Sequence, residues 1–137
     1  MKVWSIFGIF ALLLSVCEAY NRNAVTRWSA ANCQQTVWQC AEFASRAAHA
    51  GGAFNGLDLG SMRWKGYNMR WVPDLKQAMQ ADGWRYAGSG TGNAGDILLY
   101  NNEGHAAVSR GGGYLDQANP ARCNGYAAWG TREVWSK

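Results

Sequence analysis

The chain has 137 residues, a formal net charge of +4 at pH 7 and a pI near 9.0. Its length is that of one domain of ordinary size, which excludes an enzyme built from a cofactor domain and a separate substrate domain. Hydrophobic residues make up 48% of the chain and charged residues only 16%, so a disordered chain is excluded as well. There are 2 histidines, too few for a metal site built on several histidines.

The first 19 residues are typical of a secretory signal peptide. Lys2 gives a cationic start, and the stretch 3–16 is mostly apolar. Small residues, Cys17 and Ala19, occupy the two positions that a signal peptidase reads. The apolar run is shorter than the roughly 20 residues that a membrane-spanning helix needs. We therefore expect cleavage after Ala19 and a secreted, extracellular protein with no membrane span, whose single domain covers 20–137.

The cysteines that remain after cleavage are odd in number. They are Cys33, Cys40 and Cys123, so in an oxidising compartment two would pair and one thiol would be left over. A disulfide between Cys33 and Cys123 would tie the first helical region to the C-terminal segment and leave Cys40 reduced. The rival pairing, Cys33 with Cys40, closes a short loop and frees Cys123. The two pairings therefore differ in which sulfur can react.

Helical periodicity and capping signals predict three helices in the first part of the chain. They run through 24–31, over 40–50 and from Pro73 to Gly83. Asn21 or Asn23 can cap the first helix, and Gly51 follows the end of the second. Residues 51–70 show no clear period, and we interpret them as a structured loop.

After the third helix the hydrophobic pattern changes to that of short strands separated by Gly and Asn. The strand candidates are 84–86, 97–100, 106–108, 114–115 and 132–135. The run Gly111-Gly112-Gly113 lies between two of them and indicates a hairpin turn. The predicted helices come first along the chain and the strands of an antiparallel sheet follow, which is typical of an α+β fold.

Cys40 lies where the second helix should begin. At that position a thiolate faces the positive end of the helix dipole and unpaired backbone N–H groups, which lower a thiol pKa and can also hold an oxyanion. A nucleophilic cysteine also needs a base. His49 lies on the same helix, about 180° around it and about 13 Å along it from Cys40, so it cannot reach the sulfur. The base must then be His105, which follows Gly104 and opens a strand candidate.

Three segments carry a family resemblance. They are Gln39-Cys40-Ala41-Glu42-Phe43-Ala44, Gly95-Asp96-Ile97-Leu98-Leu99 and Gly104-His105-Ala106-Ala107-Val108. In kind and order they resemble the cell-wall amidases and endopeptidases of the NlpC and CHAP type, papain-like hydrolases that cut amide bonds in the peptide stems of peptidoglycan. The resemblance covers Tyr20 to about Asn119, and the small size also resembles compact secreted amidase toxins. It implies a papain-like fold with N-terminal helices packed on a small antiparallel sheet, Cys40 as nucleophile and His105 as base.

A base of this kind needs a polar partner on its second ring nitrogen, and three residues of the following hairpin could supply it. With a three-residue turn at 111–113, Gln117 and Asn119 share the face of His105 while Asp116 points away. With a two-residue turn at Gly111-Gly112, Asp116 lies diagonal to His105 instead. The resemblance places a polar residue near Gln117, so we expect Gln117 as the partner, Asn119 as the second choice and Asp116 as the third.

These observations predict a secreted cysteine amidase or endopeptidase that acts as a monomer on bacterial peptidoglycan, with an antibacterial role. The helix-start position of Cys40 favours the Cys33–Cys123 disulfide. We expect no metal, because no second carboxylate or free histidine joins Asp96. We also expect no cofactor and no nucleic-acid partner. One alternative is a non-catalytic cell-wall or carbohydrate-binding module with the same fold. The other is a secreted binding or toxin protein stabilised by a Cys33–Cys40 disulfide.

Overall fold

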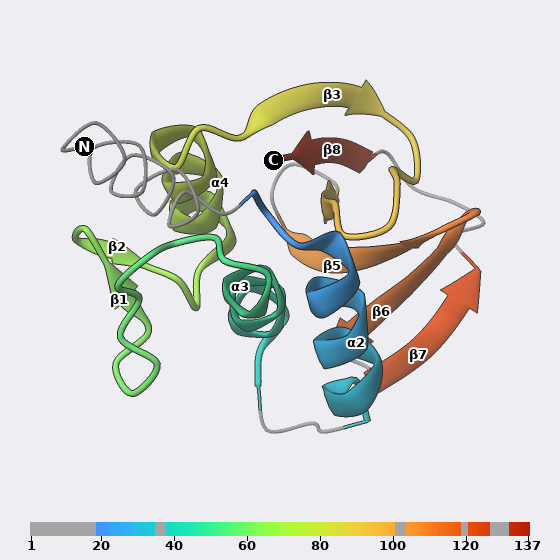
Figure 1. Cartoon of the computed structure of the whole chain (residues 1–137), viewed down its shortest axis with the longest axis horizontal. Coiled ribbons are helices and arrows are strands. Elements are labelled where there is room, and N and C mark those ends of the chain that lie inside the picture. Colours follow the sequence, from blue (N-terminus) through green and yellow to red (C-terminus); the bar gives the residue numbers. More distant parts are fainter. Residues whose placement is uncertain (1–18, 35–37, 101–103, 119–120, 127–131) are drawn as a thin grey trace, which may run out of the picture.

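The computed structural model describes residues 19–34, 38–100, 104–118, 121–126 and 132–137. Within these residues, helices pack on one face of a six-stranded antiparallel sheet, and a small two-stranded hairpin lies on the far side of the helices (Figure 1). The helices are α2 (Arg22–Asn32), α3 (Cys40–Ala50) and α4 (Val72–Ala81). The strands of the large sheet are β3 (Arg85–Ser89), β4 (Ile97–Tyr100), β5 (His105–Gly111), β6 (Tyr114–Ala118), β7 (Ala121–Tyr126) and β8 (Arg132–Ser136). The predicted α+β fold, with N-terminal helices on an antiparallel sheet, is confirmed.

The helix α2 begins at Arg22 because Asn21 caps it. The side-chain oxygen of Asn21 accepts a hydrogen bond of 3.0 Å from the backbone N–H of Ala24, which decides between the two caps that the sequence offered. Val25 and Ser29 are its buried residues. The helix therefore starts two residues earlier than its apolar pattern alone indicates.

The helix α3 has the predicted bounds and is the central helix. Its small, buried side chains are Ala41, Ala44, Ala47 and Ala48. They let the helix approach α2 and β5 closely, and it contacts both. At its end, a Cβ on Gly51 would lie 2.7 Å from the backbone oxygen of Asn21, so only glycine fits where α3 ends against the start of α2.

The strand order of the large sheet is β3-β8-β4-β5-β6-β7. The C-terminal strand β8 lies between β3 and β4, as Figure 1 shows. The strand β7 at one edge was not predicted, because 121–126 is polar and has no alternating apolar pattern. The hairpin of β1 (Arg63–Trp64) and β2 (Tyr67–Asn68) lies inside the predicted structured loop, and its strands of two residues are too short to show a period.

The register of β5 and β6 is the one that turns Gln117 toward His105. Val108 pairs with Asp116, and the ladder then shifts at a bulge before Gly111 pairs with Tyr114. The prediction of a three-residue turn is therefore wrong. The turn has two residues, Gly112 and Gly113, both with positive φ (64° and 91°), as a hairpin turn of matching twist requires. Arg110 is the extra, unpaired residue of the bulge. It makes up for the shorter turn, so the rest of the ladder has the predicted register.

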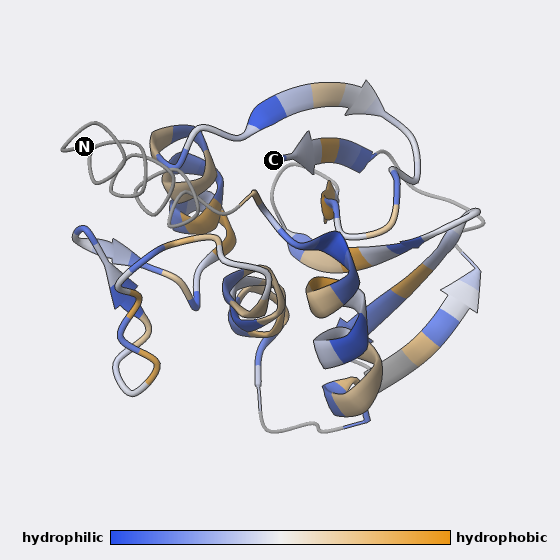
Figure 2. Ribbon diagram, viewed as in Figure 1, coloured by the Kyte–Doolittle hydropathy of each residue, from blue (hydrophilic) through white to orange (hydrophobic). Residues whose placement is uncertain are grey.

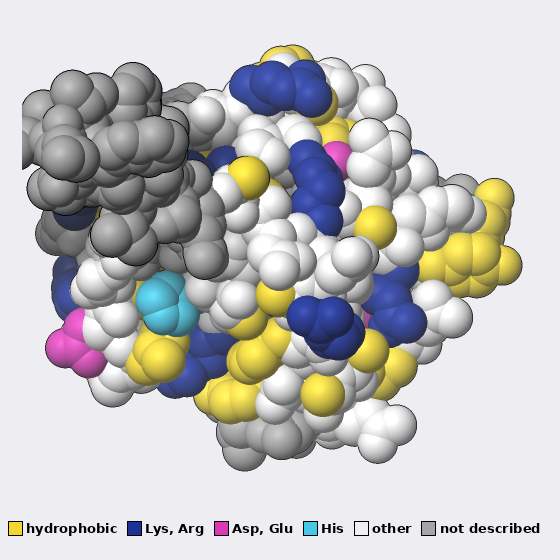
Figure 3. Space-filling view, in the orientation of Figure 1, with side chains coloured by type: hydrophobic (Ala, Val, Ile, Leu, Met, Phe, Trp, Pro, Cys, Tyr) yellow, Lys and Arg dark blue, Asp and Glu magenta, His cyan; other side chains and the backbone are white. Residues whose placement is uncertain are grey.

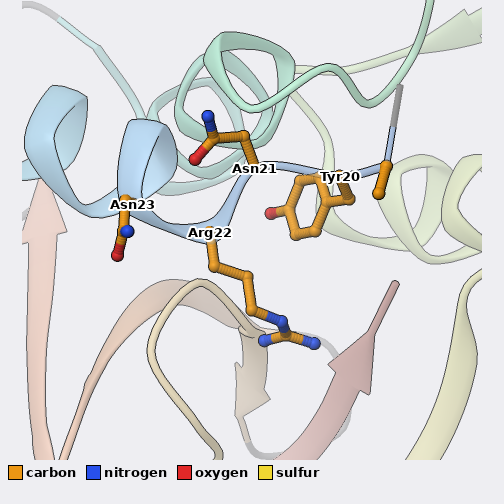
Figure 4. Close-up of a pocket in the computed structure, with 5 residues that line it drawn as sticks. Tyr20, Asn21, Arg22 and Asn23 are labelled. Carbon is orange, nitrogen blue, oxygen red and sulfur yellow. The ribbon is translucent and has the colours of Figure 1, made fainter. Parts of the chain in front are cut away.

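An ion pair fastens the start of α2 to the sheet. Asp96, just before β4, is 2% exposed, and its Oδ1 accepts hydrogen bonds from Arg22 Nη1 at 2.6 Å and from Ser136 Oγ at 2.8 Å. Figure 4 shows the hollow at this end of α2, with Arg22 extending away from Asn21 toward the strands. This contact joins residues far apart in the sequence and holds α2 in its place on the sheet.

The hydrophobic core lies between the helices and the sheet. In Figure 2 hydrophobic residues gather on α3, α4 and β4, the elements that meet there. Trp135 and Trp64 are buried in this core, and Trp71 is exposed by 58%. Trp28 packs against the core and is partly buried.

The cysteine pairing is Cys33 with Cys123, as predicted, with the two Cα atoms 5.5 Å apart. The bond joins the end of α2 to the edge strand β7. Among the described cysteines, Cys40 is the one with a free thiol. The expected signal peptide lies outside the described residues apart from Ala19 and stays a prediction. No helix in the described ranges is long and apolar enough to cross a membrane.

Candidate active site

The thiol of Cys40 sits at the N-terminus of α3. Cys40 is the first residue of the helix and is partly exposed. Within the described part of the chain, the N-cap residue Gln39 makes no side-chain hydrogen bond to cap the helix. The backbone N–H of Ala41 instead donates to the sulfur. The helix therefore presents its positive end to the thiol.

His105 faces this thiol from the sheet. It is the first residue of β5, the strand on which α3 packs, and it makes a side-chain hydrogen bond to Cys40. The backbone N–H of Ala106 also donates to the sulfur. Burial raises the pKa of Cys40, but the hydrogen bonds from His105 and from the two backbone N–H groups outweigh burial. The net pKa of the thiol is lowered.

The pKa of His105 is raised in turn. Its hydrogen bond to Cys40 is the largest cause, burial acts in the opposite direction, and the hydrogen bond to Gln117 adds to the rise. A lowered pKa on the thiol and a raised pKa on the imidazole favour the thiolate–imidazolium form of the pair. The arrangement can therefore supply a charged sulfur nucleophile together with a proton donor.

Gln117 holds the other side of the imidazole. Its Oε1 lies 2.7 Å from Nε2 of His105, across the adjacent strands β5 and β6. Because an amide oxygen can only accept, Nε2 carries the proton and Nδ1 is left to exchange a proton with the sulfur of Cys40. Gln117 thus fixes the tautomer that a base facing Cys40 needs.

Asp116 points to the opposite side of β6 and does not orient His105. It is fully buried, and its carboxylate accepts hydrogen bonds from Ser29 Oγ, from Arg110 Nη1 at 3.1 Å and from the backbone N–H of Asn124 at 2.7 Å. Its role is to join α2 to the hairpin of β5 and β6 and to β7. Asn119, the second candidate for the partner of His105, lies outside the described residues.

The remaining histidine is remote from the pair. His49 lies near the end of α3, is partly buried, and its Nδ1 is 3.1 Å from the backbone oxygen of Ala53. The argument that it cannot reach Cys40 from the far end of the helix therefore holds. In the described ranges, no group of three or more His, Cys, Asp and Glu side chains could hold a metal ion.

An ion-pair cluster beside Cys40 was not predicted from the sequence. Glu42, two positions after Cys40, is buried and accepts hydrogen bonds from Arg46 Nε at 3.0 Å and from Arg70 Nε at 2.9 Å. Arg70 also donates to the backbone oxygens of Ser61 and Gly60. The long loop 51–70 is thereby fastened to the first turn of α3. A glutamate between Ala41 and Phe43 is the sequence signal that could have predicted the cluster, because a Glu that an apolar helix buries is normally paired.

Trp38 lies just before the helix and is tied to the same cluster. The guanidinium of Arg46 stands 5.0 Å from the centroid of its ring, and its centroid is 5.5 Å from that of Trp28. Trp38 and Arg46 therefore place an aromatic ring and a positive charge near the start of α3. Figure 3 shows Lys and Arg side chains spread over one face of the molecule with few Asp and Glu between them.

Comparisons with known proteins give one solved structure of similar fold. No family model matches the chain, and no curated protein matches it. The fold is similar to that of a chain in the crystal structure of the type VI native effector–immunity complex Tae3–Tai3 from Ralstonia pickettii. The TM-score is 0.56 at 20% sequence identity, and the match covers 85% of this chain and 98% of that one. The α+β architecture that carries Cys40 and His105 is thus shared with a protein of a type VI effector–immunity complex.

Proposed function

We propose that this protein is a secreted cysteine amidase or endopeptidase that hydrolyses amide bonds in the peptide stems of bacterial peptidoglycan. The observation that carries the proposal is the contact of Cys40, at the start of α3, with His105, whose second nitrogen is held by Gln117. The opposite shifts of the two pKa values favour the charged pair that nucleophilic attack requires.

The chemistry follows from these positions. The thiolate of Cys40 attacks the carbonyl carbon of the amide, and backbone N–H groups of the first turn of α3, beginning with that of Ala41, hold the oxyanion. Protonated His105 then gives its Nδ1 proton to the leaving amine, and the acyl group remains on the sulfur as a thioester. Neutral His105 next removes a proton from water, which hydrolyses the thioester and restores the pair. Gln117 holds the imidazole throughout.

Four observations support the choice of substrate and role. The segments around Cys40, Asp96 and His105 resemble the NlpC and CHAP type of cell-wall hydrolase. The solved structure of similar fold comes from a type VI effector–immunity complex, which supports an antibacterial role and a protein inhibitor as partner. A net charge of +4 favours binding to anionic bacterial walls. The expected signal peptide supports secretion.

Cleavage of purified muropeptides, followed by mass spectrometry, tests the proposal. The wild-type protein should release two fragments whose masses sum to the substrate plus one water, with one new amine end. His105→Ala should abolish the reaction, and His49→Ala, a matched change at the remote histidine, should leave it intact. Retention of the protein on intact walls with no muropeptide cleaved would instead favour a non-catalytic wall-binding module.

A further inference from the structure

Tyr100, His105 and Arg132 lie abreast on three adjacent strands. Tyr100 ends β4 and pairs with His105 on β5 and with Arg132 on β8. The centroid of its ring is 5.5 Å from that of the imidazole, with 53° between the planes. On the other side, Cζ of Arg132 is 5.8 Å from the centroid of the Tyr100 ring. The phenol ring therefore stands between the imidazole and a guanidinium.

Tyr100 is itself held in place. It is only 9% exposed, and Arg132 makes a side-chain hydrogen bond to its phenol. Nε of Arg132 donates in turn to the backbone oxygen of Gly90 at 3.0 Å. Burial raises the pKa of Tyr100 and the Arg132 hydrogen bond only partly offsets the rise, so the ring remains a neutral phenol. The buried phenol ring, held at its hydroxyl by Arg132, is therefore a rigid and uncharged neighbour of His105.

A rigid ring at this distance has two effects on an imidazole. It restricts rotation of the His105 side chain, and a π face within about 6 Å of a cation favours the charged form. Within the described ranges, the groups that face His105 are Cys40 from α3, Gln117 from β6 and Tyr100 from β4, with Arg132 from β8 behind the phenol. Of these, Cys40 and Gln117 form hydrogen bonds with the nitrogens of the imidazole, and Tyr100 packs against the imidazole ring.

We propose that Tyr100, braced by Arg132, is a positioning residue that holds His105 in the orientation that serves Cys40. The proposal rests on the proposed function in taking His105 as the base. Four variants test it: Tyr100→Leu removes the ring, Tyr100→Phe keeps it, Arg132→Gln removes the brace, and Tyr86→Leu is the matched control. Tyr86 is 56% exposed on β3, which β8 separates from β4.

The first readout is the rate at which iodoacetamide alkylates Cys40 as a function of pH, which requires no knowledge of the substrate. At about pH 6, Tyr100→Leu should lower this rate about tenfold, because less of the charged pair is formed. The kcat on a muropeptide should fall by about the same factor with KM within about twofold. Tyr100→Phe keeps the ring but loses the hydrogen bond from Arg132, so both values should lie between those of wild type and those of Tyr100→Leu. Tyr86→Leu should change neither.

The second readout is the pKa of His105, followed by NMR. In Arg132→Gln a loosened ring lowers this pKa, whereas loss of a nearby positive charge alone would raise it. A raised pKa in Arg132→Gln, or an unchanged alkylation profile in folded Tyr100→Leu, would overturn the proposal. If Tyr100→Leu does not fold, Arg132→Gln decides by itself. If Cys40 of the wild-type protein is alkylated at low pH but the protein cleaves no muropeptide, the proposed substrate is wrong. The role of Tyr100 would be unaffected by that result.

Discussion

His105 and Gln117 are joined across β5 and β6 by a hydrogen bond of 2.7 Å between Nε2 and Oε1. The partner of the imidazole is thus a neutral amide. It fixes the tautomer but adds no negative charge, so the charge that favours the imidazolium comes from the thiolate of Cys40. Orientation of the imidazole and stabilisation of its charge are therefore divided between two residues.

The first prediction concerns Gln117→Ala. Removing the amide frees the imidazole to rotate and to change tautomer, and kcat should fall by about 10- to 100-fold, the value of one charge-assisted hydrogen bond. The unfolding midpoint should change little. Steady-state kinetics on a muropeptide measure the effect, with Gln80→Ala, exposed on α4, as the control. Equal kcat values for the two variants would show that Gln117 does not orient the base.

The second prediction concerns pH. The pKa of Cys40 is lowered and that of His105 is raised, and both shifts favour the charged pair over the neutral one. The stability that Cys40 contributes is lost as pH falls through its lowered pKa, and that of His105 is lost as pH rises through its raised pKa. Alkylation of Cys40 should therefore begin well below the ordinary thiol pKa of about 8.5.

The matched variant for this profile is His105→Ala. Without the imidazole, the alkylation profile should move up toward the ordinary thiol pKa, because the largest cause of the lowered value is gone. His49→Ala should leave the profile in place. An identical profile for wild type and His105→Ala would mean that the histidine does not act on the sulfur.

The third prediction concerns the disulfide. Cys33 and Cys123 are separated by 90 positions, and a loop of that length corresponds to a stabilisation of about 4–5 kcal/mol in the chain-entropy account. The double variant Cys33→Ser/Cys123→Ser should lose on the order of that free energy of unfolding in a denaturant titration. Cys40 stays reduced in both proteins, so a loss below about 1 kcal/mol would show that the bond does little to stabilise the fold.

The fourth prediction concerns salt. Binding to intact walls should weaken as salt rises, because the attraction of a chain of charge +4 to an anionic polymer is screened over roughly 10 Å at about 0.1 M salt. Hydrolysis of small soluble muropeptides should change much less. Co-sedimentation with walls and kinetics on muropeptides give the two dependences. If both fell equally, surface charge would have no separate part in wall binding.

The sequence was informative where local signals decide the structure. The bounds of α3 follow from an alanine-rich run that begins at Cys40 and is closed by glycine. Strand register alone left more than one partner of His105 open, and the family resemblance favoured Gln117, whose register the structure has. The edge strand β7 could not be predicted, because the disulfide at Cys123 and its pairing to β6 hold a polar segment in place. Contacts between distant segments, such as Tyr100 on His105, leave no periodic signal in the sequence.

Selective alkylation of Cys40 tests the central claim most directly. One equivalent of iodoacetamide should modify Cys40, located by peptide mapping under non-reducing conditions that keep the Cys33–Cys123 peptide intact. Hydrolysis of a purified muropeptide should then fall to the background rate. If the fully alkylated protein cleaved the muropeptide at the wild-type rate, or if mapping found Cys40 in a disulfide, Cys40 would not be the nucleophile.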